Sequence, residues 1–217
     1  AFEKDNRAQV YGKEFKGIGD SYVSSGRADQ CFEPIYWNSG RLVELTVRNA
    51  AEPLVIHAVE FIETHYPIVP ESRFDCNRPE YRAVTPLLLR TLKMCTHDVF
   101  MDCPYYERLM YIGDARTEAL TLMAAARDDR PVRNALTMFA KSRLQNELVM
   151  SRYPTRLAQN IPPYALLFIN MLHDYALWRG NAELVRPMLP RVREILAVFE
   201  PFIDGEGLLH RLPGWNF

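Results

Sequence analysis

Three carboxylic acids, Asp102, Glu107 and Asp114, lie in one short stretch of the sequence. Pro104 disfavours a continuous helix there, and Gly113 precedes the next apolar pattern. The stretch is therefore expected to be a loop or an irregular turn at one end of a helical layer. Burial and like charges can raise the pKa of one carboxyl while its neighbours stay ionised. Such a cluster is typical of sites for acid-assisted bond cleavage.

Three tyrosines, Tyr105, Tyr106 and Tyr111, accompany these carboxylates. A tyrosine ring combines a flat apolar face with a hydroxyl, which suits the C–H faces and OH edges of a sugar. A carbohydrate is therefore a ligand that this segment could bind.

The same residues also have structural interpretations. Asp102 or Asp114 could be the N-cap of a helix, and for Asp114 taken alone this is the preferred interpretation. Glu107 and Arg108 could form half of a surface ion pair, and the tyrosines could belong to the core. Composition alone does not decide between these interpretations and a functional one.

Neither a metal nor a cofactor is expected. His97, Asp98, Asp102 and Glu107 are residue types that bind zinc or manganese, but their spacing matches no helical metal motif. We expect His97 to be a structural side chain bonded to a loop carboxylate or to the backbone. Cys103 is interpreted as a buried thiol, since no general base stands beside it.

The overall charge argues against strongly charged partners. Lys+Arg 26 against Asp+Glu 27 leaves a net charge of -1, so no global field favours nucleic acid or an anionic membrane. No apolar run approaches the roughly 20 residues that cross a bilayer. A neutral partner fits best, and the compartment stays open between the cytoplasm and export.

The first third of the chain has the residue pattern of β-strands. Segments rich in β-branched and aromatic residues alternate with turn-forming residues. Polar and apolar residues alternate in Arg41–Val47, which predicts one wet face and one packed face, as in an antiparallel sandwich. Strands are expected at Ser21–Val23, Cys31–Trp37, Arg41–Val47 and Leu54–Glu63.

A linker and a helical region are expected to follow. Three prolines interrupt the polar stretch Tyr66–Tyr81, so we place the domain boundary there, between residues 1–70 and 71–217. Apolar residues then recur with a helical period, and short links predict antiparallel neighbours. Five helices are expected: one containing Leu88, Leu92 and Cys95, one containing Ala115, Ala119, Leu122 and Met123, and three at Pro131–Leu144, Tyr164–Trp178 and Val185–Phe202.

The run from Asp102 to Asp114, DCPYYERLMYIGD, resembles the acidic motif of glycoside hydrolase family 78, the inverting α-L-rhamnosidases. The resemblance covers residues 85–217. It implies a mainly α fold with an N-terminal β segment, in which antiparallel β-sandwich strands precede the first half of a catalytic (α/α)6 barrel, a toroid of helices. Supporting stretches are His97–Asp98, Ser151–Pro154, Ile161–Pro163, His173–Tyr175 and Pro213–Phe217.

The resemblance also implies roles for individual residues. Glu107 would be the general acid that protonates the glycosidic oxygen, and the two aspartates would bind rhamnose hydroxyls. Tyr111 stands where many family members have Trp and would keep an aromatic wall. Trp215 would form another wall beside the sugar's methyl group. The expected substrate-binding residues are Asp102, Asp114, Tyr111, Trp215 and Arg108.

Inversion needs a second carboxylate about 6.5–9.5 Å from the acid. The resemblance implies that this general base is a Glu in the later half of the barrel, beyond Phe217. The chain is thus expected to be a fragment, whose parent cleaves terminal α-L-rhamnosides in a rhamnose-containing glycoside or polysaccharide. Two alternatives stay open: a non-catalytic carbohydrate-binding helical domain, and an (α/α)6 glycosidase for a different sugar. The oligomeric state is open as well.

Overall fold

The computed structural model describes residues 9, 11–12, 17, 19–48, 52–212 and 214. The chain divides into two compact units, Ala1–Ile62 and Glu63–Phe217, and each is described by itself. Every helix found among the described residues, and the buried core, belongs to the second unit.

The described part of the first unit contains no strand, so the predicted N-terminal β segment is not supported. Apolar side chains of the alternating segment stay open to solvent, with Val43 62% and Leu45 61% exposed. A strand needs a hydrogen-bonded neighbour and an apolar surface on which to pack, and this segment has neither. Local bonds dominate instead: the hydroxyl of Tyr22 and the backbone N–H of Ser25 both donate to the side-chain oxygen of Gln30, at 2.5 and 3.1 Å.

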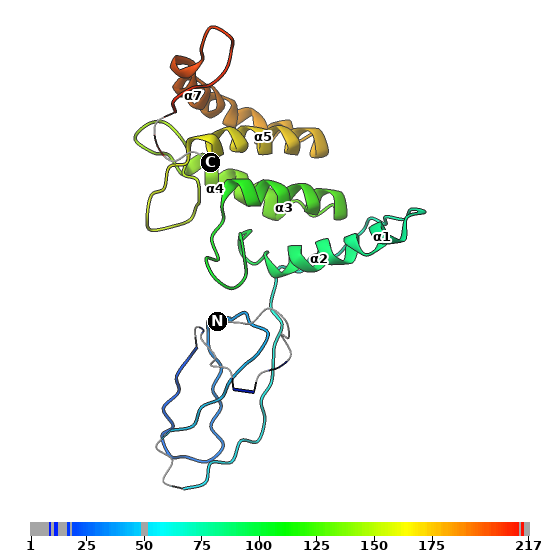
Figure 1. Ribbon diagram of the computed structural model, residues 1–217, viewed down its shortest axis with the longest axis vertical. Coiled ribbons are helices and arrows are strands. Elements are labelled where there is room, and N and C mark those ends of the chain that lie inside the picture. Colours follow the sequence, from blue (N-terminus) through cyan, green and yellow to red (C-terminus); the bar gives the residue numbers. More distant parts are fainter. Residues whose placement is uncertain are drawn as a thin grey trace. The chain divides into compact units, whose positions relative to one another are not determined.

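The second unit is built from helices that pack on one another, both between chain neighbours and between α3 and α5, which confirms a mainly helical protein. In Figure 1, α2, α3 and α5 lie side by side, with α3 between the other two. No helix within the described ranges is long and apolar enough to cross a membrane. The elements are α1 (Pro79–Arg82), α2 (Val84–Met94), α3 (Ile112–Ala125), α4 (Arg130–Lys141), α5 (Pro162–Arg179), α6 (Ala182–Val185), η1 (Arg186–Met188), α7 (Leu189–Phe199) and η2 (Glu200–Phe202).

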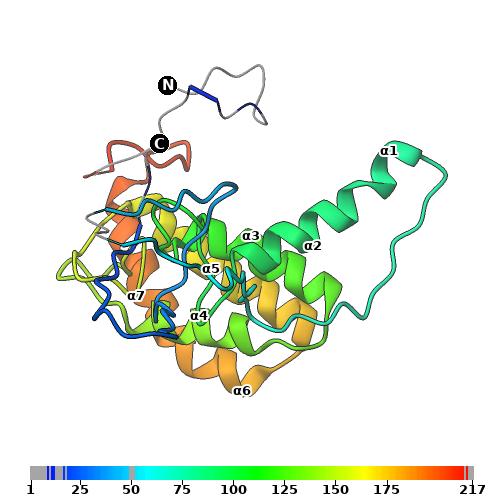
Figure 2. The same cartoon turned by 90° about the horizontal axis from the view of Figure 1, so that it is seen from below.

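Helix α5 is the centre of this unit, since it contacts α3, α4, α6 and α7; Figure 2 shows α3, α4 and α7 around it from another side. Its inward face is fully buried at Phe168, Met171 and Tyr175. Pro162 stands at its first position, where no intrahelical donor is lost, and Gly180 ends it with a φ of 62°. The helical period predicted for this segment therefore corresponds to a real packed face.

One of the expected helices is wrong as a single element. The segment Val185–Phe202 is divided into the end of α6, the short helix η1, the helix α7 and the short helix η2. Pro187 and Pro190 cause the division, because proline removes a helical N–H and clashes with the preceding turn. The apolar period survives only within α7, where Ile195 and Phe199 are buried.

The connection between α3 and α4 is more than the solvated link that its charges suggest. Asp128 accepts a hydrogen bond from the Tyr66 hydroxyl at 2.8 Å, and Asp129 accepts one from the Tyr175 hydroxyl at 2.7 Å. The ion pair with Arg130, together with the bond from Tyr66, holds the pKa of Asp128 well below its usual range. These contacts fix the C-terminal end of α3 to α5 and to the segment that precedes α1.

Candidate active site

The segment between α2 and α3 forms a closed loop at the N-terminal end of α3, as expected. The N–H of Asp102 donates to the carbonyl of Leu109 at 3.0 Å, and the N–H of Leu109 donates to Asp102 Oδ1 at 2.9 Å. The turn Pro104–Glu107 lies between these two residues. Asp102 is half-buried, and one of its two carboxylate oxygens shapes the loop.

Glu107 is exposed on this loop, where a ligand can reach its carboxyl group. Its Oε2 accepts a hydrogen bond from the Tyr111 hydroxyl at 2.7 Å. The same hydroxyl accepts a bond from Arg152 Nη1 at 2.8 Å. Burial and the Glu107 carboxylate raise the pKa of Tyr111, whereas Arg152 acts in the opposite direction. Tyr111 thus stays protonated and donates to Glu107.

Asp114 lies in the first turn of α3 but is not its N-cap, so the capping interpretation is wrong. The N-cap is Tyr111, which makes no side-chain capping bond. Although Asp114 is exposed as a residue, desolvation raises the pKa of its carboxyl, and the charges of Asp102 and Glu107 raise it further. The structure therefore brings the three carboxylates close enough to act on one another.

Two residues that the sequence did not single out form the wall of this site. Arg152 lies with its guanidinium 5.6 Å from the centre of the Tyr111 ring, and the two backbones form an antiparallel bridge. Tyr164, near the start of α5, meets the same ring edge-on, with 6.4 Å between centroids. Neither contact could be read from the spacing of residues, because both join segments far apart in the chain. The stretch Ser151–Pro154 contains Arg152, and Ile161–Pro163 directly precedes Tyr164, but the resemblance gives neither residue a role.

Three further residues were singled out from the sequence: Arg108, Cys103 and Trp215. Arg108 is half-buried with a φ of 55°, a conformation rare outside glycine. Burial lowers the pKa of His97, and the Arg108 charge adds to this effect. Cys103 is half-buried rather than buried, and its sulfur accepts a bond from the Glu107 N–H at 3.3 Å. Trp215 lies outside the described residues.

The arrangement of the described side chains does not support a metal site in this segment. Across the described positions, no group of three or more His, Cys, Asp or Glu side chains could hold a metal ion. Burial lowers the pKa of His97, so its ring is neutral near pH 7.

A fourth carboxyl group lies close to the three that the sequence indicated. Glu118 follows Asp114 by one turn of α3 and is largely withdrawn from water. Burial, with the charges of Asp114 and Asp102, raises the pKa of Glu118 to about 9. The sequence signal for this group was its place at i+4 from Asp114, since two like charges at that spacing destabilise a helix unless one of them is neutralised.

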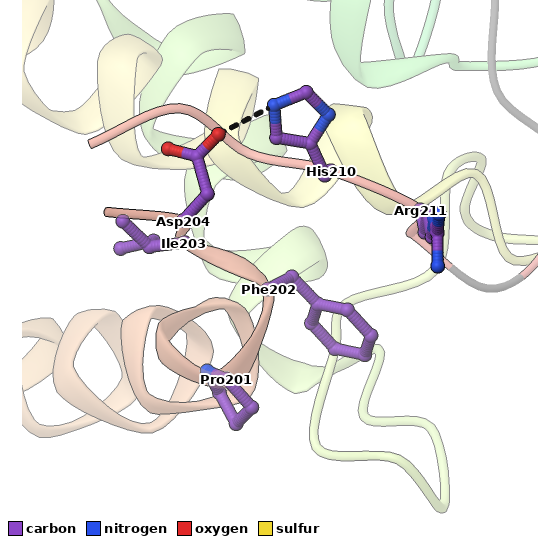
Figure 3. Close-up of a pocket in the computed structure, with 6 residues that line it drawn as sticks. All are labelled: Pro201, Phe202, Ile203, Asp204, His210 and Arg211. Carbon is purple, nitrogen blue, oxygen red and sulfur yellow. Dashed lines mark ion pairs between the residues drawn. The ribbon is translucent and has the colours of Figure 1, made fainter. Parts of the chain in front are cut away.

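A separate pocket of about 480 Å³ lies at the end of α7 and η2 and includes none of these carboxylates. Asp204 and His210 form an ion pair of 2.7 Å within it (Figure 3). Asp204 Oδ1 also accepts the N–H groups of Glu206 and Leu208, both at 2.9 Å. These bonds to the turn lower the pKa of Asp204, and we interpret the pair as structural support for the turn.

Comparisons with known proteins identify the family to which the helical region belongs. Residues 70–199 match the family model of the bacterial alpha-L-rhamnosidase 6 hairpin glycosidase domain, a range that includes all four carboxylates. The GH78 family rhamnosidase of Bacillus sp. GL1 has a similar crystal structure, with 28% identity and a TM-score of 0.64. A rhamnosidase from Klebsiella oxytoca with rhamnose bound has 24% identity and a TM-score of 0.58, which shows the fold alone.

These matches cover much of this chain but little of the others. The similar region is 70% of this chain in both comparisons, against 16% of the Bacillus protein and 30% of the Klebsiella protein. No curated protein matches the chain.

Proposed function

Because the chain belongs to the bacterial alpha-L-rhamnosidase 6 hairpin glycosidase family, we propose that it carries the acid side of a rhamnosidase active site. The parent protein would hydrolyse terminal α-L-rhamnosides with inversion. In this proposal residues 71–217 supply the first half of an (α/α)6 barrel. The observation that supports it most is the convergence of Asp102, Glu107 and Asp114 at the start of α3.

Glu107 is proposed as the general acid. Its protonated carboxyl would give its proton to the glycosidic oxygen while the bond from that oxygen to the anomeric carbon breaks, so the aglycone leaves as a neutral alcohol. The exposure of Glu107 gives the aglycone access to it. The bonded series Arg152–Tyr111–Glu107 would hold the carboxyl in one orientation.

Asp102 and Asp114 are proposed to bind rhamnose hydroxyls. The N–H of Leu109 already donates to Oδ1 of Asp102. The other oxygen, Oδ2, would therefore accept a hydrogen bond from a sugar hydroxyl. The ring of Tyr111, held between Arg152 and Tyr164, would form the aromatic wall, and Arg108 and Trp215 would complete the substrate contacts.

Water would attack the anomeric carbon from the opposite face and pass a proton to a base. Inversion needs the base about 6.5–9.5 Å from the acid and on the opposite face of the sugar, whereas the two aspartates beside Glu107 are assigned to the sugar hydroxyls in this proposal. We propose that another part of the parent enzyme supplies this carboxylate. The chain spans a minor share of both similar rhamnosidases, which supports this view.

The test is release of L-rhamnose from a natural α-L-rhamnoside by the protein that carries this chain. Proton NMR would follow the first-formed anomer, which inversion predicts to be the β-anomer. Glu107→Gln should lower release by about 10²–10⁴-fold on an alkyl rhamnoside, while Glu183→Gln, an exposed glutamate on α6, should leave it unchanged. If the folded protein binds the rhamnoside but does not cleave L-rhamnose from it, a carbohydrate-binding domain would be favoured instead.

A further inference from the structure

The backbone of the acidic loop is unusual directly after Glu107. Arg108 has a φ of 55°, in the left-handed region that residues with a side chain rarely adopt. Such a conformation costs free energy, so it persists only where the surrounding contacts outweigh that cost, and it is found most often at functional sites. The proposed acid therefore lies beside a residue whose conformation must be held by its neighbours.

Two side chains at the start of the loop supply bonds on either side of this strained residue. One residue before it, the N–H of Glu107 donates to Sγ of Cys103 at 3.3 Å. One residue after it, the N–H of Leu109 donates to Oδ1 of Asp102 at 2.9 Å. The N–H of Asp102 also donates to the Leu109 carbonyl at 3.0 Å, which closes the loop. The sulfur of Cys103 is thus the contact that acts on the backbone of the acid itself.

This contact matters because Glu107 is exposed, so burial does not hold it in place. Its carboxyl is fixed at one end, where Oε2 accepts from the Tyr111 hydroxyl at 2.7 Å. The bond from its N–H to Cys103 fixes the other end, the backbone from which the side chain departs. A proton transfer requires the acid to lie within hydrogen-bond reach of the glycosidic oxygen, and a shift of about 1 Å is costly. Both ends of the side chain therefore need a fixed position.

The surroundings of Cys103 do not support a chemical role for its thiol. A nucleophilic thiol needs a base that takes its proton, and a metal site needs further ligands. Among the residues that the structure describes, no group of three or more His, Cys, Asp or Glu side chains could hold a metal ion. The hydrogen bond beneath the turn Pro104–Glu107 is the contact from which a role follows.

We propose that Cys103 is a positioning residue of the rhamnoside site. Its sulfur holds the N–H of Glu107 and thereby supports the left-handed backbone at Arg108 that presents the acid. What the role requires is an acceptor atom at this place, which serine also offers and alanine does not. The inference rests on the proposed function for the reaction that Glu107 serves, whereas the hold on its backbone is independent of that reaction.

Amide hydrogen exchange, followed by NMR in this chain, tests the hold on the backbone without any need for activity. The N–H of Glu107 should exchange about fivefold faster in Cys103→Ala than in the wild type, and Cys103→Ser should restore most of the protection. The N–H of Met101, which donates to the Cys95 carbonyl at 2.8 Å outside the turn, is the internal reference and should keep its rate. An unchanged rate at Glu107, or an equal rise at Met101, would overturn the proposal.

Hydrolysis of an alkyl and a nitrophenyl α-L-rhamnoside by the complete protein tests the positioning role. In Cys103→Ala, kcat on the alkyl substrate should fall about tenfold with little change in KM, and kcat on the nitrophenyl substrate should fall far less. Cys103→Ser should stay within about threefold of the wild type on both substrates. Cys31→Ala, at an exposed cysteine of the first unit, should match the wild type.

Equal losses on the two substrates in Cys103→Ala would overturn the positioning role, because general damage to the structure does not depend on the leaving group. A serine variant as poor as the alanine variant would overturn it too, since the acceptor atom would then be irrelevant. If the wild-type protein cleaves neither rhamnoside, the proposed function is wrong, and the exchange rates still decide whether Cys103 holds the backbone of Glu107.

Discussion

At the scale of residues, the Tyr111 hydroxyl is the contact that orients the proposed acid. It donates to Glu107 at 2.7 Å and accepts from Arg152 at 2.8 Å. Tyr111→Phe keeps the aromatic wall but removes both bonds. A hydrogen bond to a charged group is worth about 1.5–3 kcal/mol, so kcat should fall by about tenfold to a hundredfold with little change in KM.

Steady-state kinetics on a natural rhamnoside would check this, with Tyr106→Phe as the matched control. Tyr106 is 83% exposed in the same loop, so removal of its hydroxyl should cost little. Equal losses in both variants would mean that the hydroxyl of Tyr111 does not orient the acid.

How much of the site could be predicted depends on the sequence separation of its residues. Asp102, Glu107 and Asp114 fall in one segment, so their clustering followed from the chain itself. Arg152 and Tyr164 reach the site through tertiary contacts with Tyr111, and no local pattern marks such a contact. Glu118 was missed because an acid on a helix is usually solvated, and only packing shows that this one is buried.

At the scale of elements, α3 holds the site at one end and is fastened at the other. The Tyr175 hydroxyl of α5 donates to Asp129 at 2.7 Å, directly before α4. Tyr175→Phe keeps the buried ring but leaves Asp129 without this donor, so the free energy of unfolding should fall by about 1–3 kcal/mol. Urea unfolding followed by circular dichroism would measure it. Tyr81→Phe, at an exposed tyrosine on α1, should change stability by less than about 0.5 kcal/mol; a similar loss there would contradict the anchoring role.

The helices and the strands differ in how far the sequence could predict them. A helix satisfies its backbone bonds within its own segment, so periodicity and prolines located α4 and α5 to within a few residues. In Val185–Phe202, by contrast, the apolar period predicted one helix, which Pro187 and Pro190 divide. A strand depends on a partner elsewhere, so the alternation in Arg41–Val47 indicated a tendency that the structure does not realise.

At the scale of the whole molecule, the described core belongs to Glu63–Phe217. The buried apolar cluster runs from Ile68 to Phe199 and includes no residue of the first unit. Removal of residues 1–62 should therefore shift the thermal midpoint of the helical unit by less than about 4 °C, which corresponds to about 1 kcal/mol for a domain of this size. Circular dichroism at 222 nm would follow it. A shortened chain that fails to fold would show that the first unit is needed for the helical core.

The central claim is that Glu107 gives a proton to the leaving group in a rhamnosidase site. An acid matters most when the leaving group is poor, so the decisive measurement is turnover of an alkyl and a nitrophenyl α-L-rhamnoside by the complete protein and its Glu107→Gln variant. We predict a loss of about 10²–10⁴-fold on the alkyl substrate and a far smaller loss on the aryl one. Equal losses on the two substrates would contradict the assignment of Glu107 as the acid.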